Sequence, residues 1–594
     1  MSPSPWAPPP AFTTRPTLTG SFGMTASTHW LATGAAQSVL ERGGNAFDAA
    51  VAGCLVLQVA EPHLNGPAGD LVGLVAPGGR SPRVLSGQGA APAAATIAHY
   101  RALGLDAVPG AGGLAAAIPG AFPALLLLLR EHGTWEFADV AAYAVEYAEG
   151  GVPVAPAWAR TVDAVAELFR AHWPTSAALW MPGGRVPEAG ETFRNPEWAG
   201  ALRRLAAASG SSRTDRLDAV LREWREGSVA RGLTAFLGRP HRHSDGGEYA
   251  GVLAPEDMRG YDAEWEEPVT YRFRGVDVVK APAWGSGPVL LQALAILSTF
   301  PDDELDPATA RGAHVIIEAL KLAFADRDAY YGEDAREVLG VLLSDAYARE
   351  RAALITDAAS PQWRPGAVPG REPFVPPLVS DAPSAGGSVG EPTVRADGET
   401  RGDTCHLDVV DAAGNIASIT PSGGWLQSSP AVPGLGLAAG TRLQMTWLDE
   451  AAPAALRPGA RPRTTLSPTL LQRGGEVIEA LGTPGGDQQD QWQLPYLLRR
   501  ILGGFSAQSA IDAPTFHTTH LPSSFWPRAW EPLGVVVEGR LGADVVGDLR
   551  ARGHVVTVVD DWSLGRLSSV GRGTGGILSA AANPRGASGY AAGR

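Results

Sequence analysis

The residues best suited to chemistry lie where a proline- and glycine-rich stretch ends and an alternating strand pattern begins. Thr404 opens that pattern, which spans 404–410 and is followed by a turn and a second strand at 416–420. A threonine hydroxyl alone is a weak nucleophile. If the peptide bond between Asp403 and Thr404 is cut, the new α-amino group titrates at about 8 and can serve as general base for the hydroxyl of the same residue. The junction therefore predicts a nucleophile that is made by cleaving the chain.

Two other interpretations of this junction stay open. Thr404 could be an ordinary threonine at the start of a strand, in which case the chain stays uncut and acts as an inactive binding scaffold. Cys405 and His406 could instead form a thiol nucleophile with its base. Adjacent residues of a strand face opposite sides, however, so these two side chains cannot easily meet.

Several blocks of the sequence resemble the γ-glutamyltranspeptidase family. Thr404-Cys405-His406, followed by Val-Val-Asp-x-x-Gly-Asn, is similar to the start of the family's small subunit, and the pattern at 43–52 is similar to the opening of its large subunit. About eight such blocks occur in the family's order between residues 22 and 590. The resemblance implies an N-terminal-nucleophile hydrolase that cleaves itself before Thr404. It also implies an α/β (α+β) fold, a four-layer αββα sandwich of two stacked sheets between helical layers.

The same resemblance implies how the chain is divided. Residues 1–403 correspond to the large-subunit part and 404–594 to the small-subunit part. Both parts should contribute strands to one core, so we expect one composite domain and a heterodimer of the chain's own fragments. The proline-rich stretch from about 359 to 403 should be mobile before cleavage, because it offers too little burial to repay its ordering. A plain interdomain linker would have the same composition.

Five further residues are expected at the catalytic centre or beside it. Ser422 matches by position a family threonine that hydrogen-bonds the nucleophile. Gly485 and Gly486 end a strand and open a helix, where backbone N–H groups can point at the oxyanion of a tetrahedral intermediate. Thr464 and Thr465 keep hydroxyls that the resemblance implies for binding a substrate carboxylate.

Three departures from the family bear on the substrate. Gln88 stands where the family has an arginine that pairs with the glutamyl α-carboxylate, and a neutral amide cannot replace that charged fork. Gly424 and Trp447 stand where the family has an asparagine and an aspartate that hold the α-amino group. The family label predicts γ-glutamyl transfer or glutathione hydrolysis. The departures favour an amidase for another small acid, similar to oxamate amidohydrolase or cephalosporin-acylase-like branches, with Gln88 and Trp447 still lining the substrate site.

Helices should hold these strands in place. Asn45 is a candidate N-cap for a helix that is apolar on nearly every face through Val59 and must therefore be buried. Residues 314–331 predict an amphipathic helix whose charged residues face solvent. These charged residues are Glu318, Lys321 and Asp328.

Composition excludes several classes of function. The chain has 594 residues and a formal charge of -14, with 48 basic and 62 acidic residues and no basic runs, so no nucleic-acid partner is expected. Two cysteines cannot form a disulfide framework or a structural zinc site, and no ligand spacing predicts a metal or other cofactor. No stretch has the length of a signal peptide or membrane span. We therefore expect a cytoplasmic enzyme, without membrane partners, that acts on a small-molecule amide.

Overall fold

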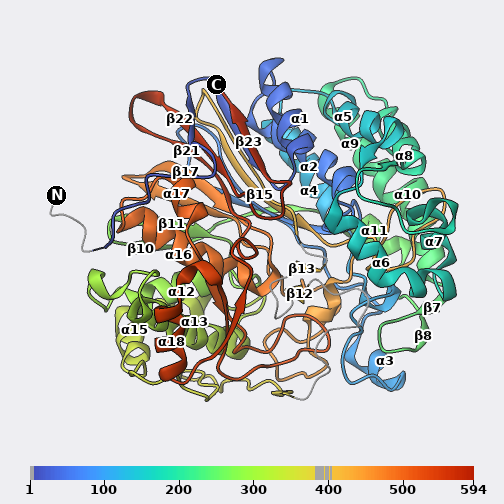
Figure 1. Ribbon diagram of the computed structural model, residues 1–594. Helices are drawn as coiled ribbons and strands as arrows, with labels where there is room; N and C mark the ends of the chain where they lie inside the picture. Colours follow the sequence, from blue (N-terminus) through green and yellow to red (C-terminus); the bar gives the residue numbers. More distant parts are fainter. Residues whose placement is uncertain (1–5, 381–392, 395–399, 402–403) are drawn as a thin grey trace.

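Two stacked sheets with helices on both outer faces form the protein (Figure 1). The computed structural model describes residues 6–380, 393–394, 400–401 and 404–594. Within these residues both large sheets have seven strands, and all their pairs are antiparallel. The predicted αββα sandwich is thus confirmed. Asp403 lies outside the described residues.

Each sheet combines strands from before and after Thr404. The first sheet has the order β1 (Leu18–Gly20), β22 (Leu578–Ala582), β21 (Ser568–Arg572), β17 (Glu476–Gly482), β16 (Thr469–Arg473), β11 (Val276–Lys280) and β10 (Val269–Phe273). The second has the order β23 (Tyr590–Gly593), β2 (Gly23–Ser27), β14 (Leu407–Asp411), β15 (Ile416–Ser422), β3 (Asp70–Ala76), β4 (Arg83–Gly87) and β9 (Glu264–Glu266). Neither part of the chain forms either of these two large sheets by itself.

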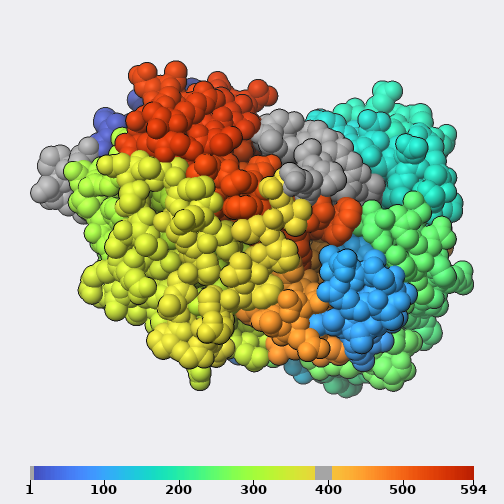
Figure 2. Space-filling model, turned by 90° about the horizontal axis from the view of Figure 1, so that it is seen from below, coloured from blue at the N-terminus to red at the C-terminus, as the bar shows by residue number. Residues whose placement is uncertain are grey.

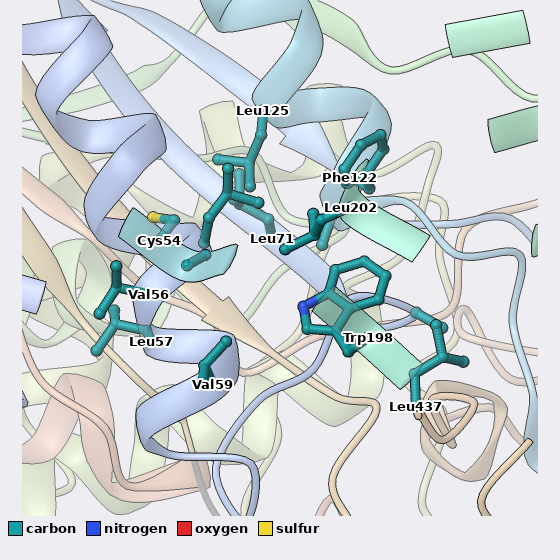
Figure 3. Packing of buried hydrophobic residues seen from close by; sticks show 14 of the residues in the cluster. Cys54, Val56, Leu57, Val59, Leu71, Phe122, Leu125, Trp198, Leu202 and Leu437 are labelled. Atoms are coloured by element: carbon teal, nitrogen blue, oxygen red, sulfur yellow. The ribbon is translucent and has the colours of Figure 1, made fainter. Parts of the chain in front are cut away.

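One helical layer covers the second sheet. Its centre is α2, which is buried along its whole length, as its sequence predicts. Leu71 of β3 packs beside α2 together with Phe122, Leu125 and Trp198 from other helices (Figure 3). The helices that contribute to this core are α1 (Trp30–Glu41), α2 (Ala46–Ala60), α4 (Ala121–His132), α5 (Phe137–Gly150), α6 (Pro156–Ala171), α7 (Pro174–Trp180), α8 (Pro196–Ala206), α9 (Arg213–Glu226), α10 (Ser228–Leu237) and α11 (Pro255–Gly260).

The other helical layer covers the first sheet, and a third apolar core fills the space between the sheets. The second layer contains α12 (Pro288–Leu297), α13 (Ala310–Tyr330), α14 (Arg336–Leu342), α15 (Asp345–Ala352), α16 (Gln489–Ile501), α17 (Ala507–Asp512) and α18 (Ala543–Ala551). A small sheet of β18 (Phe516–Thr518), β19 (Gly534–Glu538) and β20 (Val555–Val559) packs with it. Shorter elements are α3 (Ile97–Ala102), β5 (Val152–Pro153) with β6 (Thr192–Phe193), β7 (Pro240–Arg242) with β8 (Glu248–Ala250), and β12 (Thr393–Val394) with β13 (Thr400–Arg401).

Segments far apart in the sequence meet on the face seen from below. Residues near 100, in blue, lie beside orange residues near 450 (Figure 2). Arg101 donates a hydrogen bond from Nη2 to the backbone oxygen of Leu448 at 3.0 Å, and Tyr100, Leu448 and Leu456 share one apolar cluster. The loop that follows Trp447 is therefore fixed against α3.

The prediction of a solvent-facing charged stripe on α13 is wrong. Glu318, Lys321 and Asp328 are all buried. Lys321 is hydrogen-bonded to Glu318, whose other oxygen accepts a hydrogen bond from Arg364 at 3.0 Å. The Arg364 partner cannot be read from helical periodicity, because it comes from another segment of the chain.

The first part of the proline-rich stretch, 359–380, is held against α13. Lys321 Nζ donates to the backbone oxygen of Ser360 at 2.6 Å, and the backbone N–H of Gly366 donates to Asp326 at 2.6 Å. Most of the remaining stretch lies outside the described residues, so its expected mobility stays a prediction. In the part of the chain that the structure describes, no helix combines the length and apolarity needed to cross a membrane.

Removing the carboxylate that caps α2 should destabilise the fold. Asp48 is buried and accepts hydrogen bonds from the backbone N–H groups of Asn45, Thr134 and Trp135 at 2.8–3.0 Å. Asp48→Ala leaves these donors unpaired, which should cost about 3 kcal/mol and lower the thermal unfolding midpoint by about 2–3 °C for a chain of this size. Asp139→Ala, which removes an exposed carboxylate from the first turn of α5, is the matched control. Equal midpoints for the two variants in calorimetry would contradict the assignment.

Candidate active site

Three polar residues lie side by side at one end of the second sheet. Thr404 pairs with Ser422, and Ser422 pairs in turn with Asp70 at the start of β3. Directly opposed residues point to the same face of a sheet. The hydroxyl oxygens of Thr404 and Ser422 are 3.2 Å apart, and all three side chains are buried. The structure thus brings Thr404 and Ser422 together, and it adds a carboxylate to the row.

This row faces the first sheet. His406, two residues after Thr404 and just before β14, points the same way as Thr404, and its Nδ1 is 2.9 Å from the Thr420 hydroxyl. The imidazole packs on Gly482, where an added Cβ would lie 2.2 Å from the ring. Gly482 is the last residue of β17. Thr404 therefore lies at the end of the sandwich where β17 leaves the first sheet.

Gly485 and Gly486 form the turn between β17 and α16. Both have positive φ, 133° and 53°, a region that side chains with a Cβ rarely adopt. A Cβ on Gly485 would lie 2.3 Å from the Trp492 ring, and one on Gly486 would lie 2.9 Å from the Phe525 ring. A short 3₁₀ turn, Gly486–Gln488, then leads into α16. The turn needs glycine at both positions, and it lies where a helix N-terminus favours negative charge.

Asp70 connects the row to the segment after β15 and to Thr464. Arg442 Nη2 donates to one Asp70 oxygen at 2.7 Å, and the Thr464 hydroxyl donates to the other at 3.4 Å. Thr465 is buried next to Thr464. Neither Asp70 nor Arg442 is among the predicted site residues. Asp70 could have been predicted from its position directly after the glycine-containing segment 65–69. Nothing in the sequence around Arg442 indicates that it pairs with Asp70.

Gln88 lies at the far end of the row. It follows Gly87, which pairs with Leu71, the neighbour of Asp70. Its side chain is buried, and neither end of its amide has a hydrogen-bond partner among the described residues. Gln88 lines a cavity of about 610 Å³ together with Tyr261, Glu333 and Arg461. Burial of an unpaired amide is costly, so this position has hydrogen-bonding capacity to offer a ligand.

Trp447 lies further from Thr404. The guanidinium of Arg528 stacks on its ring, 3.8 Å from the centroid, and donates through Nη2 to the backbone oxygens of Gln444 and Thr446 at 2.6 and 2.7 Å. The predicted residue is therefore paired with a cation that the sequence did not indicate.

The environment of Cys405 opposes its use as a nucleophile. The thiol points to the helical layer, donates to Glu61 Oε2 at 3.1 Å, and accepts from Asn65 Nδ2 at 3.1 Å. Burial, together with the charge of Glu61, raises the pKa of this thiol well above its usual range. His406 faces the other way, toward β17. The strand geometry separates the two groups, as its alternation predicts.

One cluster among the described residues has metal-ligand types, on the other helical layer. His314, Glu318 and His554 offer ligand atoms within 4.8 Å of one another. However, His314 Nδ1 and His554 Nε2 are hydrogen-bonded at 2.9 Å, and Glu318 already pairs with Lys321 and Arg364. A cation here would have to displace these partners.

The fold and the polar row define the class of the protein. An αββα sandwich with a threonine entering a central strand, and facing the groove between the sheets, is the architecture of N-terminal-nucleophile hydrolases. The chain belongs to the gamma-glutamyltranspeptidase family, whose sequence pattern matches residues 32–593. That family consists of hydrolases and transferases.

Three similar proteins show the range of that family. The glutathione hydrolase-like YwrD proenzyme of Bacillus subtilis (strain 168) is 30% identical over 577 residues, covering 96% of this chain and 98% of its own. The oxamate amidohydrolase proenzyme of Klebsiella pneumoniae is 30% identical over 587 residues, again covering 96% and 98%. The solved structure of LmbA2991HD is 50% identical with a TM-score of 0.92, covering 98% of this chain and 100% of that one.

Thiol accessibility tests this description of the site. In the native protein Cys405 is buried and its pKa is raised, and Cys54 is buried as well, so a disulfide-exchange reagent at pH 8 should titrate neither thiol within minutes. Both thiols should react after denaturation. Cys54→Ala isolates the signal of Cys405. Fast stoichiometric labelling of native Cys54→Ala protein would show that Cys405 is accessible and would revive the thiol mechanism.

Proposed function

We propose that the chain is a proenzyme that cuts itself between Asp403 and Thr404 and then uses Thr404 to hydrolyse or transfer the acyl group of a small-acid amide. The observation that carries this proposal is the row of Thr404, Ser422 and Asp70, together with the packing of His406, two residues after Thr404, on Gly482, which the Gly485–Gly486 turn follows in the chain. The two similar enzymes named as proenzymes support self-cleavage. Fragments 1–403 and 404–594 share both sheets, so they would stay associated as a heterodimer.

The proposed reaction needs no group beyond those of the chain and water. The Thr404 α-amine takes the hydroxyl proton as Oγ attacks the amide carbonyl carbon. The resulting oxyanion is stabilised by the backbone N–H groups of Gly485 and Gly486. Collapse breaks the C–N bond, and the ammonium returns its proton to the leaving amine. Water, or an acceptor amine, then attacks the ester by the same steps and restores the threonine.

The remaining predicted residues take supporting roles in this proposal. Ser422, whose hydroxyl is 3.2 Å from that of Thr404, orients the nucleophile. Thr464, Thr465, Gln88 and Trp447 line the substrate site. No metal and no cofactor takes part.

The substrate we propose is the amide of a small acid other than a γ-glutamyl group. The buried Gln88 amide is neutral, and Arg442 is paired with Asp70, so neither supplies the free charged fork that an α-carboxylate needs. The name of one relative, oxamate amidohydrolase, supports this class. Glutathione hydrolysis is the second candidate, which the name of the YwrD relative favours. An uncut scaffold is the non-enzymatic alternative.

Removal of the Thr404 hydroxyl should stop self-cleavage. Wild-type protein should run as two bands on a denaturing gel, with the smaller one beginning Thr-Cys-His-Leu-Asp, whereas Thr404→Ala should remain a single 61.7 kDa band. Thr234→Ala removes an equally buried threonine hydroxyl from α10 and should be cut normally. A wild-type chain that stays intact after long incubation would favour the scaffold.

Substrate preference can be measured directly on the cleaved protein. We expect kcat/KM for oxamate or a glutaryl amide to exceed that for γ-glutamyl-p-nitroanilide by at least about 100-fold, because a site without the paired charges must desolvate the glutamyl zwitterion. Initial rates over a range of concentrations give the comparison. Brisk, saturable turnover of the γ-glutamyl substrate would instead assign glutathione hydrolysis.

A further inference from the structure

A cluster of buried arginines lies beneath the Gly485–Gly486 turn. Among the described residues, this cluster combines Arg327 from α13, Arg463 from the segment before β16, and Arg528 from the loop before β19. Two buried carboxylates, Asp328 and Asp487, accompany them. The charges of the described residues in this cluster therefore do not balance, since three guanidinium groups face two carboxylates.

Arg327 is the main hydrogen-bond partner of both carboxylates. This arginine donates to Asp487 through Nη1, and to Asp328 through Nε at 3.1 Å and Nη2 at 3.3 Å. Asp487 also accepts the backbone N–H of Ser524 at 2.7 Å. Arg463 is bound more loosely, with Nη2 at 3.7 Å from Asp328. The oxygens of the two carboxylates are therefore largely occupied and can do little to pair with Arg528.

The positive charge of Arg528 is the one that the two carboxylates of the cluster do not balance. The side chain of this arginine is 5% exposed, its described hydrogen bonds go to two neutral backbone oxygens, and its Nη1 has no hydrogen-bond partner in the described part of the chain. Burial, followed by repulsion from Arg463, lowers the pKa of Arg528 to about 9. Burying a guanidinium in this way costs several kcal/mol unless an anion compensates it.

The loop that carries Arg528 contacts the proposed oxyanion turn. Phe525 packs on Gly486, and Ser524 binds Asp487, the next residue. On the other side of the cluster, Arg463 directly precedes Thr464, whose hydroxyl reaches Asp70 in the row with Ser422 and Thr404. The cationic cluster is therefore linked to the Gly485–Gly486 turn through Ser524 and Phe525. It is linked to the row of Asp70, Ser422 and Thr404 through Thr464.

We propose that Arg528, backed by Arg463, forms a subsite for a carboxylate on the acyl part of the substrate. The proposal rests on the proposed function and narrows it: the substrates are monoamides of short dicarboxylic acids, with the second carboxylate bound at Arg528 while the amide carbonyl lies at Thr404. A guanidinium that presents an unused N–H matches a carboxylate in charge and geometry. Trp447, stacked under the guanidinium, fixes its plane.

The test compares charged and neutral substrates on the cleaved protein. Oxamate, malonamate, succinamate and glutaramate are each assayed beside the corresponding neutral diamide. For the best monoamide, Arg528→Met should lower kcat/KM by at least about 30-fold, whereas the value for the matched diamide should change less than about 3-fold. Arg528→Lys should recover part of the loss, because it keeps the charge without the fork.

A matched control separates recognition from general destabilisation. Arg499 on α16 is equally buried and donates to the Pro514 backbone oxygen at 2.7 Å, so Arg499→Met removes a buried guanidinium from another place. It should affect monoamide and diamide equally. Equal loss of both substrates in Arg528→Met, or a wild-type preference for the diamide, would overturn the subsite.

Dicarboxylate binding tests the carboxylate subsite even if the protein shows no cleavage or turnover. Calorimetric titration with oxalate, succinate and glutarate at constant ionic strength should give one site in wild type and none in Arg528→Met. Intact bands on the gel together with this binding would reject the self-cleaving mechanism and keep the anion subsite. Cleavage and turnover with no dicarboxylate binding would reject the subsite and keep the mechanism.

Discussion

The pairing of β14 between β2 and β15 is the interaction on which the rest of the structure depends. It joins the strand after Thr404 to a strand from the start of the chain, with Leu407 opposite both Ser27 and Ile419. The same pairing sets Thr404 opposite Ser422 and directs its side chain toward the first sheet. A register slip of one residue would turn Thr404 to the helical layer and bring Cys405 into its place. Chemistry at this position is therefore fixed by strand register.

The inner faces of β14 and β15 divide the space between the sheets into a polar end and an apolar end. His406 and Asp408 face Thr420 and Ser418 and hydrogen-bond to them at 2.9 and 2.7 Å, and His406 Nε2 lies 2.9 Å from the Asp408 carboxylate. Farther along, Val410 and Ile416 join the apolar core between the sheets. Hydrogen bonds between these buried polar groups hold the two strands in register. They provide a rigid support for Thr404 at the open end of the sandwich.

Short sequence patterns correctly predicted the features that depend only on neighbouring residues. The burial of α2, the hairpin after Thr404 and the glycine turn before α16 follow from periodicity and backbone strain, and all are present. The resemblance to a family supplied the four-layer architecture. Contacts between distant segments could not be predicted. The burial of Asp328 beside Arg463, which lies far away in sequence, was not foreseen, and Arg528 carried no motif.

The chain is acidic overall, with a net charge of -14, yet the groups beneath the Gly485–Gly486 turn are cationic on balance. Local potential depends on which charges are buried together, since exposed charges are screened by solvent and salt. A substrate carboxylate bound at Arg528 would balance this charge and leave the two backbone N–H groups of the turn to stabilise the oxyanion. The unbalanced charge would therefore serve substrate recognition, which gives a physical reason for keeping it despite its cost to folding.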